Sequence, residues 1–315
     1  MALTLAAAKE LSQDKLTNLV IDEFRKSALL DLLTFDNTVK PQGGKTLTYV
    51  YNRITTLPTA AGRAINTEYT PQETETTQQV VDLKIFGGSY QIDRVIQKNE
   101  TQVLNHIEFQ SKQKIQASNA LFHDWFINGD SAVDTKAFDG LDKAITGSST
   151  EYTPGSIIDL SSSAAMDTNW KIFLDAMRTL RARLDGTPSV WLMNIDLYGR
   201  FQSVMDRAGI NLASKDNYGM EVSQWGPALV MALGDKPGTS NPIIPVTGGN
   251  TSMYVARLSL DGVHGVSPEG DKLVETFTPD MKAPGAVKKG EVEMVAAVAM
   301  KATKSAGALR DIKVQ

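Results

Sequence analysis

The chain has 315 residues, of which 42% are hydrophobic, 32 are basic and 36 are acidic, and it contains no cysteine. This size and apolar content suffice for a sizeable core in one large domain or two ordinary ones, and the lack of cysteine excludes disulfides, thiolate metal sites and thiol nucleophiles. Because charges of both signs are mixed along the chain, no basic stripe is available to follow a nucleic-acid backbone. The first residues lack the basic start of a signal peptide, and no apolar run reaches the ~20 residues of a membrane span. We therefore expect a cytosolic protein without a membrane partner.

The N-terminal part predicts an amphipathic arm followed by a strand. Over residues 5–33, leucines recur among charged residues, which indicates one or two helices. The stretch PQGGKTLTYVYNRI at 41–54 then contains GGKT, the last part of a phosphate-binding loop. The full motif has a glycine where Val39 stands and opens a helix after its lysine, whereas the residues after Lys45 alternate in character and predict a strand over 46–54. We interpret the glycines as a turn that enters this strand.

A second strand is predicted over 79–86, where QVVDLKIF alternates apolar and polar side chains. The long connection between the two strands, at 56–80, has too few apolar residues to bury a core of its own. A structureless loop of this length is unusual in a compact domain unless another surface supports it. Gly87 and Gly88 are expected to bend the chain after the second strand.

A long helix is predicted over about 97–127, and Asn128-Gly129 is typical of its C-terminal cap. At ~1.5 Å per residue this helix would be a rod of roughly 45 Å. Its apolar stripe follows the i, i+3, i+4 spacing of one helix face and comprises Leu104, Ile107, Ser111, Ile115, Ser118, Phe122, Trp125 and Phe126. Residues 130–166 are turn-rich and are expected to link two subdomains through loop and short strand.

The second half of the chain predicts helix, strand and helix, followed by strands. A helix is expected from near Thr168 to Leu184, then a buried strand over 190–193, then a helix capped by Asn194. Further strands are expected at 228–233, 243–246, 253–260, 273–277 and from 291 onward. This order of elements indicates the α+β class.

No constellation of catalytic or metal-ligating side chains emerges. The histidines lack ligand spacing, two being on the predicted long helix and one in a turn, so we interpret them as surface or core residues; they are His106, His123 and His264. GGSYQ at 87–91 resembles a nucleophile elbow but lacks the final glycine. Three aspartates before Gly140 are too widely spaced for a calcium loop; they are Asp130, Asp134 and Asp139. We expect no enzymatic activity, cofactor or metal site.

Taken in this order, the chain resembles the major capsid proteins of tailed bacteriophages, which share the Johnson fold. The similarity covers essentially the whole chain and is clearest in TLPTAAGRAINTEY, LKIFGGSYQIDRVIQ, FINGD followed by FDGLDKAI, and VWLMNIDLYGRFQSV. It implies an α+β fold with an N-terminal arm, an extended two-stranded loop, a spine helix, and peripheral and axial domains. The implied ranges are the N-terminal arm at 1–40, the extended loop at 41–96, the peripheral domain with the spine helix at 97–165, the axial domain at 166–264 and a return to the peripheral domain at 265–315.

The resemblance implies a structural protein that assembles into hexamers and pentamers of an icosahedral head shell around double-stranded DNA. The implied partners are other copies of the chain, a separate scaffolding protein and a portal during assembly, the packaged DNA through non-specific contact, and decoration proteins. The implied location is the virion, assembled in the bacterial cytoplasm. Encapsulin-type nanocompartment shells, which enclose cargo enzymes, use the same fold and are the alternative. A soluble enzyme of another kind, monomeric and with a ligand in a concave pocket, is a further alternative.

The extended loop is expected to carry the assembly contacts, because an isolated two-stranded hairpin is marginal in water and the polar hairpin at 46–90 needs a supporting surface. The candidate interface residues are Arg63, Glu68, Tyr69, Glu73 and Glu75. Some relatives join subunits by isopeptide bonds from a lysine of this loop. The segment between Thr56 and Gln79 has no lysine, and Lys45 and Lys84 are expected at the hairpin's base, so non-covalent stabilisation is predicted. Because the first recognisable element is already the arm, we also expect no N-terminal cleavage.

Overall fold

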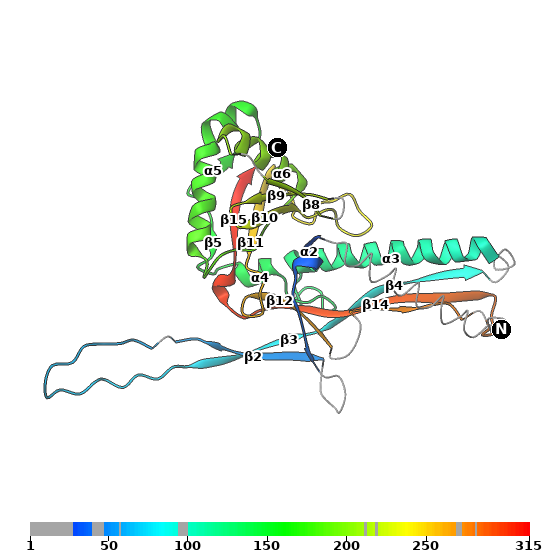
Figure 1. Ribbon diagram of the computed structural model, residues 1–315, viewed down its shortest axis with the longest axis horizontal. Helices are drawn as coiled ribbons and strands as arrows, with labels where there is room; N and C mark the ends of the chain where they lie inside the picture. The colour runs from blue at the N-terminus through cyan, green and yellow to red at the C-terminus, as the bar shows by residue number, and fades with distance from the viewer. Residues whose placement is uncertain are drawn as a thin grey trace.

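Two layers of strands and one projecting hairpin make up the molecule (Figure 1). The computed structural model describes residues 28–39, 47–56, 58–93, 100–210, 213–217, 220–268, 273–280 and 282–315. Within these ranges the strands form a five-stranded, an eight-stranded and a two-stranded sheet. The combination of helices with these sheets confirms the predicted α+β class.

Strand β14 (Val287–Met300) holds the five-stranded sheet together. Strand β4 (Lys84–Asp93) pairs antiparallel along one of its edges. Strands β13 and β12 pair antiparallel with successive parts of the other edge, and β1 adds to β12 in parallel. The bounds of these strands are Val274–Phe277 for β13, Val263–Pro268 for β12 and Phe35–Val39 for β1. One strand thus gathers segments from both ends of the chain.

The described end of the predicted N-terminal arm belongs to this layer. Helix α2 (Ala28–Leu32) leads into β1, and its neighbourhood contributes three buried leucines to the core, which are Leu29, Leu30 and Leu33. Residues 5–27 of the predicted arm lie outside the described residues. The end of the arm is therefore part of the body, held by a parallel strand pair.

Helix α3 (Glu100–Asn128) covers one face of this sheet and confirms the helix predicted over about 97–127. The buried members of the predicted stripe are Ser111, Ile115, Ser118, Phe122 and Phe126. The ring of Phe122 stacks on that of Phe86 from β4, with 6.2 Å between their centroids. This aromatic contact fixes the helix against the sheet near the centre of the molecule.

The polar positions of the helix stripe are satisfied within the layer. The hydroxyl of Ser111 donates to the hydroxyl of Tyr90 at 3.1 Å, and that of Ser118 donates to a carbonyl one turn earlier at 2.9 Å. At the end of the helix, the amide of Gly129 donates to the carbonyl of Trp125 at 3.0 Å. The predicted C-terminal end is therefore confirmed.

The eight-stranded sheet has the order β5-β15-β11-β7-β10-β9-β8, and β6 also pairs with β15. The bounds are Glu151–Tyr152 for β5, Ile158–Asp159 for β6, Val190–Met193 for β7, Ala213–Asn217 for β8, Met220–Trp225 for β9, Ala228–Ala232 for β10, Asn250–Ala256 for β11 and Ala306–Lys313 for β15. Strand β7 is buried on both faces: Trp191 packs with the helices of this lobe, and Leu192 packs with the core around α3. The two layers consequently share one wall.

Helices α5 (Ser163–Arg183) and α6 (Ile195–Arg207) cover the outer face of this sheet. Asn194 caps α6 as predicted, since its side-chain oxygen accepts the amide of Leu197 at 2.8 Å. The predicted start of α5 near Thr168 was wrong. Ser162 caps the helix by accepting the amide of Ala165, so the helix begins at the serines that were predicted to be loop. A short helix, α4 (Leu141–Ile145), and a 3-10 turn, η2 (Thr303–Ser305), were not predicted.

Several strand predictions are confirmed, and one is wrong. Strands β7, β10, β11, β13 and β14 lie where expected, whereas residues 243–246 form no strand. Ile243 and Ile244 are buried there, but Pro242 and Pro245 remove backbone donors that a ladder needs. Five strands were missed, namely β1, β8, β9, β12 and β15. His264, predicted in a turn, lies in β12.

The strand pairing crosses two of the predicted domain boundaries. Residues 151–159, assigned to the peripheral domain, pair with β15 in the eight-stranded sheet. Residues 306–313, assigned to the returning segment, also belong to that sheet, beside β11. The boundaries predicted at 165 and 265 therefore do not follow the sheets, because short strands distant in sequence complete the second lobe.

Gly87 and Gly88 do not bend the chain as predicted, because both lie inside the paired strand β4. A Cβ atom on Gly87 would meet the carbonyl oxygen of Val292 on β14 at 1.9 Å. The glycine thus permits a close approach of two backbones.

Substitution of Gly87 by alanine should lower the free energy of unfolding by about 1–3 kcal/mol, because the added methyl group forces the two strands apart. Denaturant unfolding of the purified chain measures this change. Gly62→Ala is the matched control, since no atom lies within 4 Å of its added Cβ, and it should change stability by less than about 0.5 kcal/mol. Equal stability of both variants would contradict the close-approach explanation.

Candidate assembly interface

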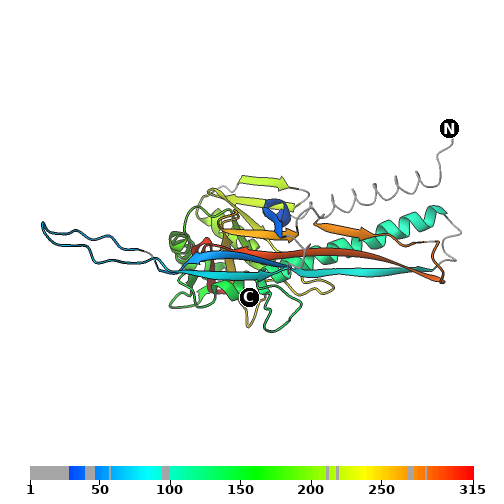
Figure 2. The same ribbon diagram turned by 90° about the horizontal axis from the view of Figure 1, so that it is seen from below.

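The two-stranded hairpin projects from the body and pairs only with itself among the described residues (Figures 1 and 2). Strand β2 (Thr48–Ile54) and strand β3 (Thr76–Asp82) are antiparallel, with an unbroken register from Thr48 opposite Asp82 to Ile54 opposite Thr76. Two facing strands were predicted, and their facing arrangement is confirmed. The bounds of the second were wrong: it was predicted over 79–86, whereas β3 ends at Asp82 and residues 84–86 belong to β4 of the five-stranded sheet. Residues 40–46, with the GGKT stretch, lie outside the described residues.

Beyond the ladder, polar contacts keep the two limbs of the loop together. The amide of Thr55 donates to the carbonyl of Glu75 at 2.9 Å, and the amide of Thr59 donates to the side chain of Gln72 at 3.1 Å. A turn at the tip contains Asn66 in a left-handed conformation, with φ of 66°. The loop therefore has local order although no other element covers it in the described part of the chain.

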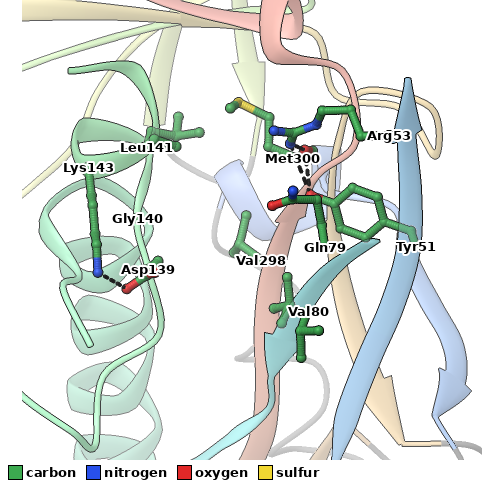
Figure 3. Close-up of a pocket in the computed structure, with 12 residues that line it drawn as sticks. Tyr51, Arg53, Gln79, Val80, Asp139, Gly140, Leu141, Lys143, Val298 and Met300 are labelled. Atoms are coloured by element: carbon green, nitrogen blue, oxygen red, sulfur yellow. Dashed lines mark hydrogen bonds and ion pairs between the residues drawn. The ribbon is translucent and has the colours of Figure 1, made fainter. Parts of the chain in front are cut away.

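The base of the hairpin is fastened to the end of β14 through backbone carbonyls (Figure 3). The hydroxyl of Tyr51 donates to the carbonyl of Met300 at 2.8 Å. The guanidinium of Arg53 donates to the same carbonyl at 2.6 Å and to that of Lys301 at 3.0 Å. The two hydrogen bonds of the planar guanidinium set the direction in which the hairpin leaves the body.

A pocket of about 290 Å³ separates the hairpin base from helix α4, lined on one side by Gln79 and Val80 and on the other by Leu141 and Lys143 (Figure 3). On the far wall, the amine of Lys143 contacts Asp130 at 2.7 Å and Asp139 at 2.8 Å. Lys143 holds the pKa of Asp130 below its ordinary value. Two of the aspartates considered for calcium thus bind a lysine.

His264 lies directly beneath the base of the hairpin and is fully buried. The ring of Tyr49 meets its ring edge-on, with 5.8 Å between centroids, and the Tyr49 hydroxyl donates to Asp36 at 2.9 Å. Neither ring nitrogen of His264 makes a hydrogen bond of normal geometry. Burial, and then the charge of Lys301, lower the pKa of His264, so the neutral imidazole is favoured.

The hairpin exposes apolar side chains near its base and at its tip. Val50 and Val80 form a cross-strand pair, and Val80 is 57% exposed. At the tip, Ile65 is 91% exposed and Tyr69 is 61% exposed. Apolar exposure on a thin ribbon with two unpaired edges is typical of a surface that another chain covers.

All of the predicted interface residues lie on the distal part of the hairpin, and all are exposed; they are Arg63, Glu68, Tyr69, Glu73 and Glu75. The structure brings together Arg63 and Tyr69, with the guanidinium carbon 5.6 Å from the ring centre. No ion pair joins Arg63 to the three glutamates within the described residues. Arg63 instead donates to the carbonyl of Thr67 at 3.1 Å. Any charge pairs of these residues with a neighbouring copy remain a prediction.

Sequence reasoning missed the apolar residues and the anchor of the hairpin. The stretch TYVYNRI carries aromatic residues at one set of alternate positions and Val50 and Ile54 at the other, which indicates a strand with two apolar faces. The partner atoms of Arg53 lie 247 residues further along the chain, so no local signal identifies the anchor. Of the lysines placed at the base, Lys84 donates to the carbonyl of Thr135 at 3.0 Å, and Lys45 lies outside the described residues.

Other kinds of site find no support in the described residues. No group of three or more acidic or histidine side chains is placed to hold a metal ion there. None of the described helices is long and apolar enough to cross a membrane.

Replacement of Arg53 by leucine should loosen the hairpin at its base, because a charged hydrogen-bond donor contributes about 1.5–3 kcal/mol. Amide hydrogen exchange over β2 and β3 measures the free energy of opening, which we expect to fall by that amount. Arg63→Leu is the matched control, since Arg63 makes one backbone hydrogen bond in the exposed tip, and it should leave exchange in β2 and β3 unchanged. Equal protection in both variants would contradict the anchoring role.

Stability should fall as the pH is lowered from about 7 to 5. Burial lowers the pKa of His123 on α3 to about 4, and the pKa of His264 is lowered in the same direction. The unfolded chain, with histidines near 6.5, then binds more protons than the folded chain, which destabilises the fold by at most about 1.4 kcal/mol per pH unit for each histidine. Unfolding curves at several pH values measure the slope, and His264→Gln should reduce it. An unchanged slope in that variant would refute a buried neutral His264.

Comparison with known proteins shows a fold-level likeness. No protein-family model and no curated protein matches the chain. Among solved structures, the encapsulin of a holo-complex from Synechococcus elongatus PCC 7942 is 13% identical, with a TM-score of 0.58, and the match covers 91% of this chain and 88% of that chain. The capsid of Myoviridae phage XM1 is 10% identical, with a TM-score of 0.56 and coverage of 90% and 91%. The capsid of a native GTA particle is 10% identical, with a TM-score of 0.57 and coverage of 91% and 90%. The chain therefore has the Johnson fold, the capsid fold of tailed phages.

Proposed function

We propose that the chain is a major capsid protein that self-assembles into the icosahedral head shell of a tailed bacteriophage, enclosing its double-stranded DNA. The observation that carries this proposal is the projecting hairpin, which is paired only with itself in the described part of the chain and exposes apolar side chains along its length. A surface of this kind gains its support from a second copy. The capsid of phage XM1 among the structural neighbours favours the same function.

The energetics of the hairpin suit repeated, individually modest contacts. A two-stranded ribbon alone is marginally stable, so the exposed Ile65, Tyr69 and Val80 stabilise the structure only when another surface buries them. Full burial of such a side chain contributes about 1.5–3 kcal/mol. Each subunit of a shell repeats these contacts with its neighbours, so the contributions accumulate over the particle.

The further partners and the location follow from this proposal. We expect a scaffolding protein and a portal during assembly, non-specific contact with packaged DNA, and decoration proteins on the outside, in a virion assembled in the bacterial cytoplasm. The formal net charge of −4 suits an inner surface that does not grip DNA, since tight binding would hinder packaging and ejection. A structural role without enzymatic activity is part of the same proposal.

An encapsulin-type nanocompartment shell is the second candidate function, favoured by the encapsulin match. The two functions differ in what the particle contains and how large it is. Electron microscopy of particles formed by the chain distinguishes them, because a small shell filled with protein supports the compartment and a large head-like shell supports the phage capsid.

The proposed function predicts that the distal hairpin is needed for assembly and not for folding. Replacement of residues 56–74 by Asn-Gly joins Thr55 to Glu75 through a two-residue turn that suits an antiparallel hairpin, and it preserves the whole β2–β3 ladder. We expect a folded monomer by circular dichroism and sedimentation, and no shells by negative-stain microscopy, whereas the unaltered chain forms particles. Shells of normal yield from the shortened chain would refute the proposal.

A further inference from the structure

A histidine without hydrogen-bond partners lies under the base of the hairpin. His264 of β12 is fully buried, and neither of its ring nitrogens forms a hydrogen bond of normal geometry within the described residues. Most buried polar groups in proteins are hydrogen-bonded, and one without a partner destabilises the fold. An apolar side chain would fill the same space without this cost, so the presence of an imidazole needs an explanation.

The strand pairing fixes the backbone of His264 and the face to which its side chain points. Strand β12 lies between β1 and β14, with His264 opposite Ala299 and Gly265 opposite Phe35. The ring centroids of Phe35 and of Phe122 on α3 are 6.3 Å apart, so Gly265 lies on the face that α3 covers. Because successive side chains of a strand alternate between faces, His264 points to the other face. Its ring cannot reach water by a movement of β12 that keeps both strand pairings.

On that other face, Tyr49 of the hairpin covers His264. The two rings meet edge-on with 5.8 Å between their centroids, and Tyr49 itself is only 8% exposed. The Tyr49 hydroxyl donates to Asp36 of β1 at 2.9 Å. Asp36 is paired with Val266, two residues after His264 and therefore on the same face. The side chain of Tyr49 thus crosses β12 and separates the imidazole from solvent.

The groups around His264 offer no good partner for an imidazolium. The charged and titratable groups that face it are Tyr49 of β2, Asp36 of β1, Asp261 in the turn before β12 and Lys301 just after β14. Asp36 already accepts from Tyr49, and Asp261 binds Arg257 at 2.6 Å. The amine of Lys301 lies 5.5 Å from the centre of the Tyr49 ring and would repel a second cation. The neutral imidazole is therefore the form that fits under the hairpin.

Docking of the hairpin and protonation of His264 consequently oppose each other. Burial, and then the charge of Lys301, lower the pKa of His264 while Tyr49 covers it. Exposed to water, the same side chain would have an ordinary pKa near 6.5. The free energy that holds the hairpin docked is complete above about pH 6.5 and is lost progressively as the pH falls below that value.

Lys301 connects His264 to the anchor of the hairpin. Its amine lies over the ring of Tyr49, and its carbonyl accepts from Arg53 at 3.0 Å. Tyr49 and Arg53 are four residues apart on β2 and therefore project from the same face of that strand. A positive charge on His264 thus acts on both of the contacts by which Lys301 holds the hairpin.

We propose that His264 is a pH-sensitive switch for the hairpin: the neutral imidazole keeps the base of β2 docked on the body, and protonation releases it while the rest of the fold stays intact. Release lets water reach the charged ring and lets the hairpin change direction relative to the body. The switch belongs to a single subunit, so it goes beyond the proposed function and can be tested on the unassembled chain.

Distances between two fluorescent labels test the switch in a chain that has no cysteine of its own. Ile54→Cys at the end of β2 and Ile172→Cys on α5 provide the label sites, because these side chains are 56% and 53% exposed. In the dilute chain we expect one narrow distance distribution at pH 7.5 and a second, released population at pH 5. The released fraction should rise about tenfold or more, since each pH unit below 6.5 changes the equilibrium by up to tenfold. Circular dichroism should stay native at both pH values.

Variants assign the response to His264. His264→Phe keeps an aromatic ring under Tyr49, and His264→Gln is a smaller uncharged replacement; at least one should fold, and neither should release the hairpin at pH 5. Lys301→Gln removes the repelling amine and keeps the carbonyl that binds Arg53, so it should weaken the response. His123→Gln is the matched control, because it removes the other buried histidine, on α3, and should leave the response unchanged.

Three results would overturn the switch. They are an unchanged distance distribution between pH 7.5 and 5, an equal response in the folded His264 variants, and loss of the native circular dichroism together with the change in distance. If the response is absent while the unaltered chain still forms shells, the proposed function stands and the switch is wrong.

Discussion

The structure depends on strand β14. This strand pairs with three other strands, and the carbonyl of its last residue accepts the hydrogen bonds that hold the hairpin. Its two edges join β4 with β13 and β12, and the hairpin is fastened where it ends. The chain then turns through η2 into β15, a strand of the other lobe. A change in the path of β14 would therefore move the hairpin, the covering helix and the second lobe together.

Local patterns were enough to predict the elements that depend on local physics. The alternation in β2 and β3, the stripe of α3 and the cap at Asn194 are all encoded within a few residues. Elements that depend on distant contacts were missed. Strand β12 contains Gly265, where a Cβ would meet the ring of Phe35 at 2.4 Å. In the sequence this glycine indicates a turn, and its role in a strand is evident only from the pairing of β12 with β1.

The candidate site shows the same division. Its position on the extended loop follows from composition, because a long polar segment without a core needs support from elsewhere. The anchor at the hairpin's base cannot be predicted in this way, because the carbonyls that accept from Arg53 belong to residues near the other end of the chain.

The fastening of the hairpin to backbone carbonyls has a consequence for mutational tolerance. Carbonyl groups are present whatever side chain they accompany, so substitutions at Met300 and Lys301 leave the acceptors of Arg53 in place. At position 53 the tolerance is small, because even lysine replaces a planar fork by a single point charge. The orientation of the assembly hairpin is thus encoded on one side of the joint alone, and sequence drift on the other side leaves the geometry of a shell unchanged.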